Sequence, residues 1–386
     1  MNEKTNRNSE QGALNIPLTR PYFDEEELEE IEEVLDSGWV SQGPKTKEFE
    51  DAFAKYVGAK YAVAVTNCTA ALHISLLGIG IGGGDEVIVA DFTHPATGHS
   101  VLYCGAKPVF VDVNLRTYNI DPSLIADKIT EKTKAIIPVH TFGQPADMDA
   151  VMEIASDHNL RVIEDAACAH GAKYKDKFAG TIGDIGCFSF HARKGMTTGE
   201  GGMVVTDNKK LVEEIRSLSV YGTVSTWDRE KIDKFSIPEF IKLGYNYKMS
   251  DILAAVGVAQ LRRIDKLIEK KRDLAEYWNE RLQNLEFIVP PYCSKNVKHV
   301  YQSYVALVDK KINRNRLIEL TRSMGIQTQI GTYACHIQPV YNSNQKCPNS
   351  LDIFNRSLSL PLYYKLREED INVAAELLEK IMRELA

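Results

Sequence analysis

The 386-residue sequence predicts an α/β fold, with a mostly parallel, seven-stranded sheet sandwiched by helices and a smaller C-terminal α+β domain. The first observation is a succession of short β-branched runs between residues 61 and 206. The second is that helix-like stretches separate most of these runs, a pattern typical of parallel strands covered by helices on both faces. The third is a change of pattern after residue 250, where a long helical stretch leads into a mixed region.

The large domain is predicted to begin its sheet at residue 61. Its strand candidates are YAVAVT (61–66), EVIVA (86–90), PVFVDV (108–113), KAIIPVH (134–140), LRVIED (160–165), IGCFSF (185–190) and GMVVT (202–206), and its helix candidates are residues 69–80, 122–129 and 147–159. Only a loop separates the last two strands, so we expect one of them to be antiparallel.

The second half of the chain is predicted to start with a long helix at residues 250–285 that bridges two domains. SYVALV (303–308) and IQTQIG (326–331) are strand candidates beyond it. An amphipathic helix is expected at the C-terminus, starting near REED (367–370), where acidic side chains suit the helix dipole. We therefore expect a mobile N-terminal tail, a large domain and a small domain, with bounds 1–14, 15–265 and 266–386.

Composition and charge exclude several classes of protein. The chain is 44% hydrophobic with a formal net charge of −7, which weighs against nucleic-acid binding because phosphate neutralisation needs a basic surface. No apolar run is long enough to span a membrane, and the polar N-terminus lacks the core of a targeting segment. The seven cysteines form no CxxC pair. We expect reduced thiols, a cytoplasmic protein and no bound metal.

The stretch GIGIGG (78–83) matches the G-x-G-x-x-G pattern of dinucleotide-binding proteins. That motif should follow a strand and open a helix, whereas here it follows a predicted helix and precedes a predicted strand. We expect a helix end and a turn, which weakens the alternative of a Rossmann-type dehydrogenase.

Polar side chains follow the carboxyl ends of several predicted strands, where open α/β sheets bind their ligands. Asn67-Cys68-Thr69 open a helix whose N–H groups could hold a phosphate, although Asn67 or Thr69 could equally be an ordinary cap. His94 follows the next strand, where a planar side chain could lie against a ring, or it is a solvated loop histidine.

Three further groups extend this pattern. Asp165 ends an apolar strand and either needs a ligand or caps the following turn. Ser189 lies on the strand that leads to Lys194, and a lone lysine in a loop is usually a surface charge. Together these groups supply what pyridoxal phosphate (PLP) requires: an amine for its aldehyde, an anion for its pyridine nitrogen, and donors for its phosphate. The turn TTGEGG after Lys194 would let the backbone pass close to such a site.

At these residues the sequence resembles the DegT/StrS-type sugar aminotransferases, which are fold type I PLP-dependent enzymes. The resemblance extends from about Ile16 to the C-terminus. Its most specific parts are FSFHARKGMTTGEGG (188–202), LGYNYKMSDILAAVGVAQL (243–261) and VIEDAACAHGA (162–172).

The resemblance implies a role for each matching residue. Lys194 matches the lysine that carries the cofactor covalently, and Asp165 matches the partner of the pyridine nitrogen. His94 stands where the family usually has an aromatic residue against the ring. Asn246 matches an asparagine that reaches the phosphate in the neighbouring subunit, which implies a homodimer. The phosphate is expected to contact Ser189, Cys68, Thr69 and Ala70.

Two positions depart from the family pattern. Cys168 stands where many members have a glutamine beside the cofactor's ring hydroxyl, so this contact is weakened or replaced, or Cys168 is simply a small buried side chain. Lys248 stands where many relatives have arginine, and it cannot offer the same planar fork.

The implied activity is transfer of an amino group from an amino acid, expected to be L-glutamate, to a keto-sugar joined to a nucleoside diphosphate. Lys194 would then move a proton, for which we expect a lowered pKa. The substrate candidates are Trp39, His191, Tyr333 and His336, and Glu200 has no assigned role. Two alternatives stay open: a PLP sugar dehydratase, which would replace the lysine by histidine, and a non-catalytic ligand-binding regulator.

Overall fold

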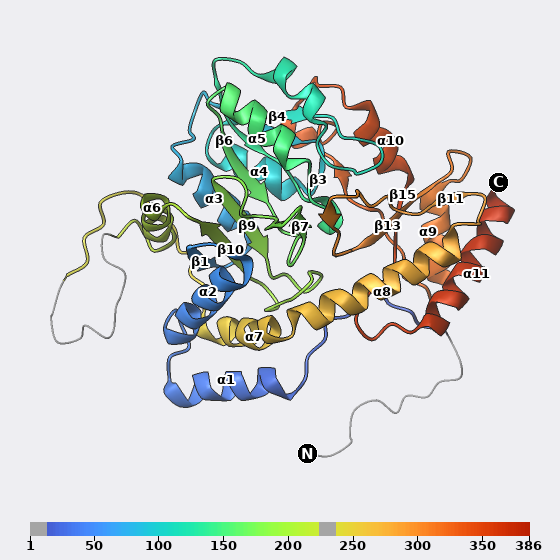
Figure 1. Cartoon of the computed structure of the whole chain (residues 1–386), viewed down its shortest axis with the longest axis horizontal. Helices are drawn as coiled ribbons and strands as arrows, with labels where there is room; N and C mark the ends of the chain where they lie inside the picture. The colour runs from blue at the N-terminus through green and yellow to red at the C-terminus, as the bar shows by residue number, and fades with distance from the viewer. Residues whose placement is uncertain (1–13, 224–236) are drawn as a thin grey trace.

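The computed structural model describes residues 14–223 and 237–386 (Figure 1). Its centre is a seven-stranded sheet in the order β1-β10-β9-β6-β5-β2-β4. β10 is antiparallel to both of its neighbours, whereas the other adjacent pairs are parallel, so the predicted sheet is confirmed. The strands are β1 (Tyr61–Val65), β2 (Glu86–Ala90), β4 (Lys107–Val111), β5 (Thr133–Ile137), β6 (Arg161–Asp165), β9 (Ile185–Ser189) and β10 (Gly202–Thr206).

Helices cover both faces of this sheet, because side chains alternate between the faces along each strand. Val63 and Val65 of β1 pack in one apolar cluster with α3, whereas Ala62 and Ala64 pack in another with Phe49 of α2. The helices in this half of the chain are α1 (Glu25–Ser37), α2 (Pro44–Val57), α3 (Cys68–Gly78), α4 (Pro95–Tyr103), α5 (Met148–Asp157) and α6 (Lys209–Ser219), with short 3₁₀ turns η1 (Pro122–Leu124), η2 (Ala126–Lys128) and η3 (Thr141–Gly143).

Two sequence-based expectations for helices need correction. Residues 122–129 do not form one helix, because only Ile125 is buried among them and no apolar stripe stabilises an α-helix. Residues 250–285 form two helices, α7 (Asp251–Arg262) and α8 (Ile264–Leu282). They separate at Arg263, whose guanidinium contacts Asp24 and Glu27 near the start of α1.

The turn at GIGIGG agrees with its prediction. α3 ends at Gly78, and β2 begins at Glu86. These glycines therefore lie between a helix and the following strand, which is the wrong context for a dinucleotide-binding loop.

The C-terminal part contains a three-stranded antiparallel sheet packed on α8 and on two further helices. The stretch 326–331 was expected to be a strand, but it changes partner within three residues: Ile326 pairs with Ile16 and Gln329 pairs with Ser359. Its ladder is thus too short for a strand. The elements here are β11 (Ile288–Val289), β12 (Val297–Lys298), β13 (Tyr304–Val308), α9 (Arg314–Ser323), β14 (Tyr333–Ala334), η5 (Pro339–Tyr341), α10 (Pro348–Arg356), β15 (Ser357–Leu360) and α11 (Glu368–Leu385).

Short strands connect the two parts. β14 pairs with β3 (Phe92–Thr93), and β12 pairs with β7 (Lys173–Tyr174), which continues to β8 (Lys177–Phe178). The predicted tail falls almost entirely on residues 1–13, outside the described residues, and the boundary at 265/266 stays a prediction. Among the described helices, none combines the length and the apolar character that crossing a membrane requires.

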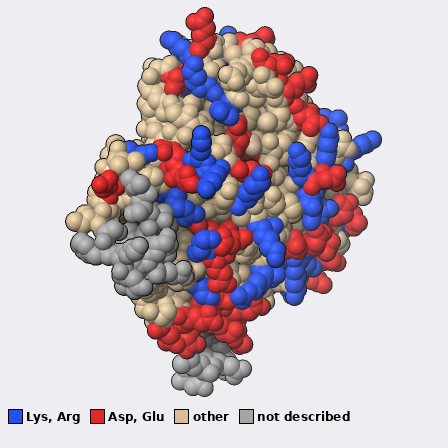
Figure 2. Space-filling model, turned by 60° about the vertical axis from the view of Figure 1, so that its left-hand side comes forward, with Lys and Arg blue, Asp and Glu red and all other residues tan. Residues whose placement is uncertain are grey.

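Acidic and basic side chains are interspersed over the face shown in Figure 2. Ion pairs connect α1, α2 and α7. Lys45 contacts Glu30 and Glu33, and Arg262 also contacts Glu30. The helices that flank the sheet are thus joined by a network of charges in addition to their apolar contacts.

Candidate active site

Lys194 lies in a tightly folded loop that follows β9. The loop turns back on itself, because the Phe190 N–H donates to the Gly201 carbonyl (2.8 Å) and the Thr198 N–H donates to the Phe190 carbonyl (3.0 Å). Gly199 occupies the left-handed region (φ +87°) that glycine adopts readily. The Lys194 ammonium donates to Cys168 Sγ at 3.2 Å, so its side chain is directed into the protein rather than into solvent.

The protein groups around Lys194 shift its pKa, whereas the lowered pKa expected beside a pyridinium ring stays a prediction. Burial acts to lower the pKa of this amine, but Cys168, Cys68 and Asp165 act in the opposite direction, and the net shift is upward. With its pKa raised, Lys194 is therefore a cation in this environment.

Asp165, at the end of β6, is 5% exposed and accepts two hydrogen bonds. Its Oδ1 accepts from the Ala167 N–H at 3.1 Å, so it does cap the following turn, as one alternative proposed. Its Oδ2 accepts from Thr97 Oγ1 at 2.8 Å, and Thr97 in turn contacts Thr93 Oγ1 at 3.1 Å. Sequence reasoning missed Thr97, because a threonine inside a helix carries no distinguishing signal.

The residues predicted to bind the phosphate lie where three strand ends meet. Gly202, the first residue of β10, is paired with Val65 on one side and with Ser189 on the other. A Cβ atom at Gly202 would lie 2.5 Å from the carbonyl carbon and oxygen of Asn67 and 2.8 Å from the Cys68 nitrogen. Glycine is thus required for β10 to approach the start of α3. Because Ser189 is paired with Gly202, this approach brings Ser189 near the start of α3 as well.

The start of α3 also limits which groups can contact an anion. Asn67 caps the helix, since its Oδ1 accepts from the Ala70 N–H at 2.8 Å. The first N–H groups of a helix have no intrahelical partner, so Cys68 and Thr69 are the better candidates to donate to a phosphate. A buried hydroxyl, a helix N-terminus and a close backbone together fit a phosphate-bearing cofactor.

His94 caps α4, and its Nδ1 accepts from the Ala96 N–H at 3.2 Å. Partial enclosure first, and the charge of Lys194 second, lower the pKa of His94 and favour the neutral ring. The ring meets Tyr333 edge to face, with centroids 6.1 Å apart and planes at 78°. His94 therefore lies at the junction of the large sheet and the C-terminal part.

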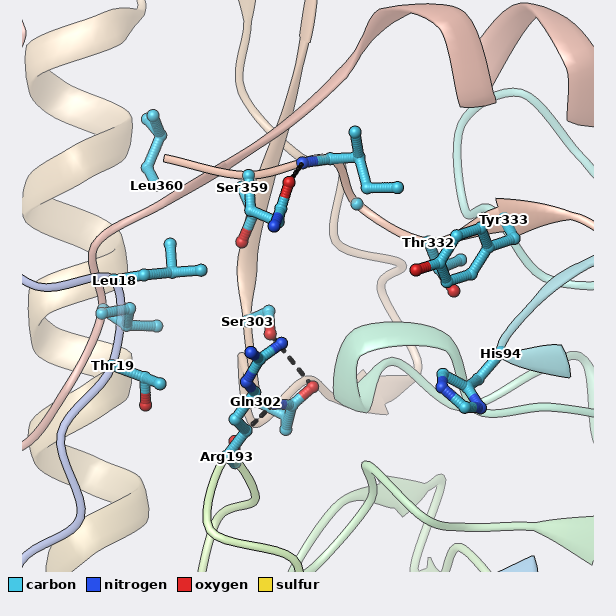
Figure 3. Close-up of a pocket in the computed structure, with 14 residues that line it drawn as sticks. Leu18, Thr19, His94, Arg193, Gln302, Ser303, Thr332, Tyr333, Ser359 and Leu360 are labelled. Atoms are coloured by element: carbon cyan, nitrogen blue, oxygen red, sulfur yellow. Dashed lines mark hydrogen bonds between the residues drawn. The ribbon is translucent and has the colours of Figure 1, made fainter. Parts of the chain in front are cut away.

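A cavity of about 210 Å³ adjoins His94 and Tyr333 (Figure 3). Arg193 enters it from the loop that carries Lys194, and Gln302 and Ser303 form the adjacent wall. Of the four predicted substrate residues, only Tyr333 lines this cavity. The remaining lining residues are Leu18, Thr19, Gln329, Ile330, Gly331, Thr332, Ser359, Leu360 and Leu362.

His336 is held by Asp91, a fully buried carboxylate that follows β2. Its backbone N–H and its Nδ1 donate to the two Asp91 oxygens at 2.6 Å each, and Ser350 Oγ also donates to this carboxylate. The hydrogen bond to Asp91 raises the pKa of His336. These contacts anchor the segment that carries Tyr333; a substrate contact of His336 stays a prediction.

The other candidates lie apart from the cavity. His191 Nε2 is 3.8 Å from Glu200 Oε1, which gives the previously unassigned Glu200 a partner. Trp39 packs close to Gly43 between α1 and α2. Lys248 donates to Asn246 Oδ1 and lies 4.3 Å from the centre of the Tyr221 ring. The predicted contact of Asn246 with a neighbouring subunit stays a prediction.

Comparison with known proteins shows the family of this chain. The model of the DegT/DnrJ/EryC1/StrS aminotransferase family matches residues 21–378. An uncharacterised protein of Methanocaldococcus jannaschii is 41% identical, with 96% of this chain and 98% of that protein covered. The spore coat polysaccharide biosynthesis protein SpsC of Bacillus subtilis is 38% identical, with coverage of 95% and 97%.

Solved structures show the same fold. The PLP form of a Streptococcus pneumoniae protein assigned as a sugar aminotransferase superposes with a TM-score of 0.90 at 28% identity. The match covers 96% of this chain and 100% of that one. The pyridoxamine phosphate form of the same protein also gives a TM-score of 0.90.

Proposed function

This chain belongs to the DegT/DnrJ/EryC1/StrS aminotransferase family, and we propose that it transfers an amino group from L-glutamate to a keto-sugar carried on a nucleoside diphosphate. It is a transaminase, and its cofactor is PLP. The observation that supports the proposal most strongly is the inward direction of Lys194, whose ammonium donates to Cys168 Sγ and is close enough to Asp165 for that residue to raise its pKa. A dehydratase of this fold would lack that lysine.

Bound PLP supplies an electrophilic aldehyde and a ring that accepts electron density. Asp165 is proposed to hold the proton on the ring nitrogen, and Thr97 and the Ala167 N–H keep its carboxylate in place. Ser189, Cys68 and Thr69 are proposed to bind the phosphate. These contacts would fix the cofactor's orientation relative to Lys194.

Lys194 is proposed to carry a proton in each half of the reaction. With PLP and the donor bound, Lys194 Nζ would take the proton from the donor's Cα and pass it to the cofactor. The same amine returns a proton when the acceptor sugar is aminated. The raised pKa of Lys194 must fall for this role, and the charge brought by the protonated ring beside Asp165 acts in that direction.

The sugar acceptor is supported by relatives rather than by a contact in this chain. SpsC is described by its part in spore coat polysaccharide synthesis, and the Streptococcus pneumoniae protein is assigned as a sugar aminotransferase. We propose by analogy that the acceptor here is a 3-keto or 4-keto deoxysugar nucleotide. The product would be an amino sugar nucleotide for glycan synthesis.

The acceptor is tested with purified enzyme, PLP, glutamate and a panel of nucleotide-linked keto-sugars. Mass spectrometry should detect an aminated sugar together with an equal amount of 2-oxoglutarate. Enzyme that forms 2-oxoglutarate but aminates only simple keto acids would contradict the sugar proposal while leaving the transaminase assignment intact.

A further inference from the structure

The cavity of Figure 3 has one strongly basic group and no acidic one among the described residues that line it. Arg193 is that basic group. Within the described part of the chain, its guanidinium makes no hydrogen bond and no ion pair, and its side chain is exposed to the cavity. An arginine without a protein partner in a pocket can bind a ligand anion through its planar fork of donors.

The backbone of Arg193 is held in place although its side chain is not. The Arg193 carbonyl accepts from Gln302 Nε2 at 2.7 Å. The Gln302 carbonyl in turn accepts from the buried Lys271 ammonium at 2.8 Å, and the Gln302 N–H donates to the Phe142 carbonyl at 2.9 Å. Because the backbone of Arg193 is already fixed, ligand binding has to order only its side chain.

Neighbouring residues of this loop point in different directions. Lys194 points inward to Cys168, whereas Arg193 points into the cavity toward Ser303. A donor that gives its α-proton to Lys194 must keep its α-carbon near the lysine. Arg193 is therefore better placed for a group at the far end of that donor.

The remaining walls and the volume indicate the size and chemistry of the ligand. Hydroxyl and amide groups come from Thr19, Ser303, Thr332, Gln302 and Gln329. The cavity of about 210 Å³ is smaller than the roughly 300–1,000 Å³ typical of sites for drug-sized ligands. It suits an amino acid better than a whole nucleotide sugar.

We propose that this cavity binds the amino donor and that Arg193 selects a dicarboxylic donor by pairing with its distal carboxylate. The proposal rests on the proposed function and adds a residue that distinguishes glutamate from its neutral isostere glutamine. The side chains of Ser303 and Gln302, in the cavity wall next to Arg193, hold each other in place, since Ser303 Oγ donates to Gln302 Oε1 at 3.1 Å.

The test measures the donor half-reaction alone, so no sugar is needed. The change in cofactor absorbance during a single turnover is recorded at increasing concentrations of glutamate or glutamine. Wild type, Arg193→Gln and Arg193→Lys are compared. Arg193→Gln should weaken apparent glutamate binding about 10- to 100-fold, the loss expected for one charge-assisted pair, with a far smaller effect for glutamine. Arg193→Lys should recover part of the loss, because it keeps the charge without the fork.

Two controls make the outcomes distinct. Arg383→Gln removes an arginine that pairs with Glu379 on α11, away from the cavity, and should leave glutamate saturation unchanged. Calorimetry with glutarate, a dicarboxylate without an amino group, measures the affinity of the cavity for a carboxylate independently of turnover. Glutarate should bind to wild type and bind far more weakly to Arg193→Gln.

Unchanged glutamate saturation and glutarate binding in Arg193→Gln would overturn the proposal. So would weakened binding of a nucleotide sugar with unchanged glutamate binding, because Arg193 would then serve the phosphate of the acceptor. Wild-type protein that binds glutarate through Arg193 but converts no amino acid would refute the proposed function and leave the carboxylate site standing.

Discussion

Asp165 is the residue whose surroundings are most specific to the proposed chemistry. It is almost completely buried, yet in the described residues its two oxygens accept only from a hydroxyl and a backbone N–H. A buried carboxylate that makes no ion pair is costly, so a cation that arrives with the ligand would compensate for the burial of its charge. The ring nitrogen of PLP can carry such a proton.

Asp165→Asn keeps the shape of this side chain and removes its charge. We expect the donor half-reaction to slow by about 100- to 1,000-fold, the loss usual for a preorganised electrostatic contact. Thr97→Val, which removes only the hydroxyl that holds Asp165, should slow it by about tenfold. Stopped-flow absorbance gives both rates, and a wild-type rate in Asp165→Asn would contradict its assigned role.

At this scale the sequence predicted the residues that follow strand ends and missed those defined by tertiary contacts. Lys194, Asp165 and Ser189 could be proposed from the sequence because each is on or after an apolar strand, and their roles stay predictions. Arg193 and Thr97 could not be found, because the direction of a loop side chain and the partner of a helical threonine depend on packing.

At the scale of elements, the site depends on how closely β10 approaches α3. The antiparallel direction of β10 brings its first residue, Gly202, to the edge where the parallel strands end. This explains the glycines after Lys194 better than flexibility does, since a side chain at Gly202 would overlap the backbone of Asn67.

Gly202→Ala should therefore weaken PLP binding by more than about tenfold, because a backbone clash forces the start of α3 to shift. It should also lower the melting temperature. The matched control is Gly83→Ala, since a Cβ there meets nothing within 4 Å, and it should behave as wild type. Fluorescence titration with PLP measures the affinity; equal affinities for the two variants would refute the close-approach explanation.

The errors at this scale have a common physical cause. The strand periodicity of the large sheet was strong because its strands are buried on both faces, and all seven were found. The stretches 122–129 and 326–331 each lack a continuous packed face, so local propensity was a poor guide. The break at Arg263 depends on acidic partners near α1 that are distant in sequence.

At the scale of the whole molecule, α8 connects the loop of Lys194 with the C-terminal part. Lys271 and Arg272 on α8 hold the carbonyls of Gln302 and His299 at 2.8 Å each. Burial lowers the pKa of Lys271 to about 8, so this chain contains a second enclosed amine near the cofactor site. Any experiment on Lys194 must distinguish these two lysines.

The proposed homodimer predicts that Asn246 acts in the site of the other subunit. Coexpressed Lys194→Ala and Asn246→Ala chains should recover roughly one quarter of wild-type activity, because half of the dimers are mixed and each holds one intact site of two. Each variant alone should be nearly inactive. If Asn246 served its own chain, mixed dimers would contain no intact site and activity would not recover.

The most direct test of the central claim identifies the lysine that carries PLP. Holoenzyme is reduced with borohydride, digested and analysed by mass spectrometry, with and without prior exposure to glutamate. We predict the cofactor mass on the peptide that contains Lys194, and loss of this label after glutamate has converted the cofactor to its amine form. Label on Lys271, or label that glutamate does not remove, would contradict the assignment of Lys194 as the catalytic amine.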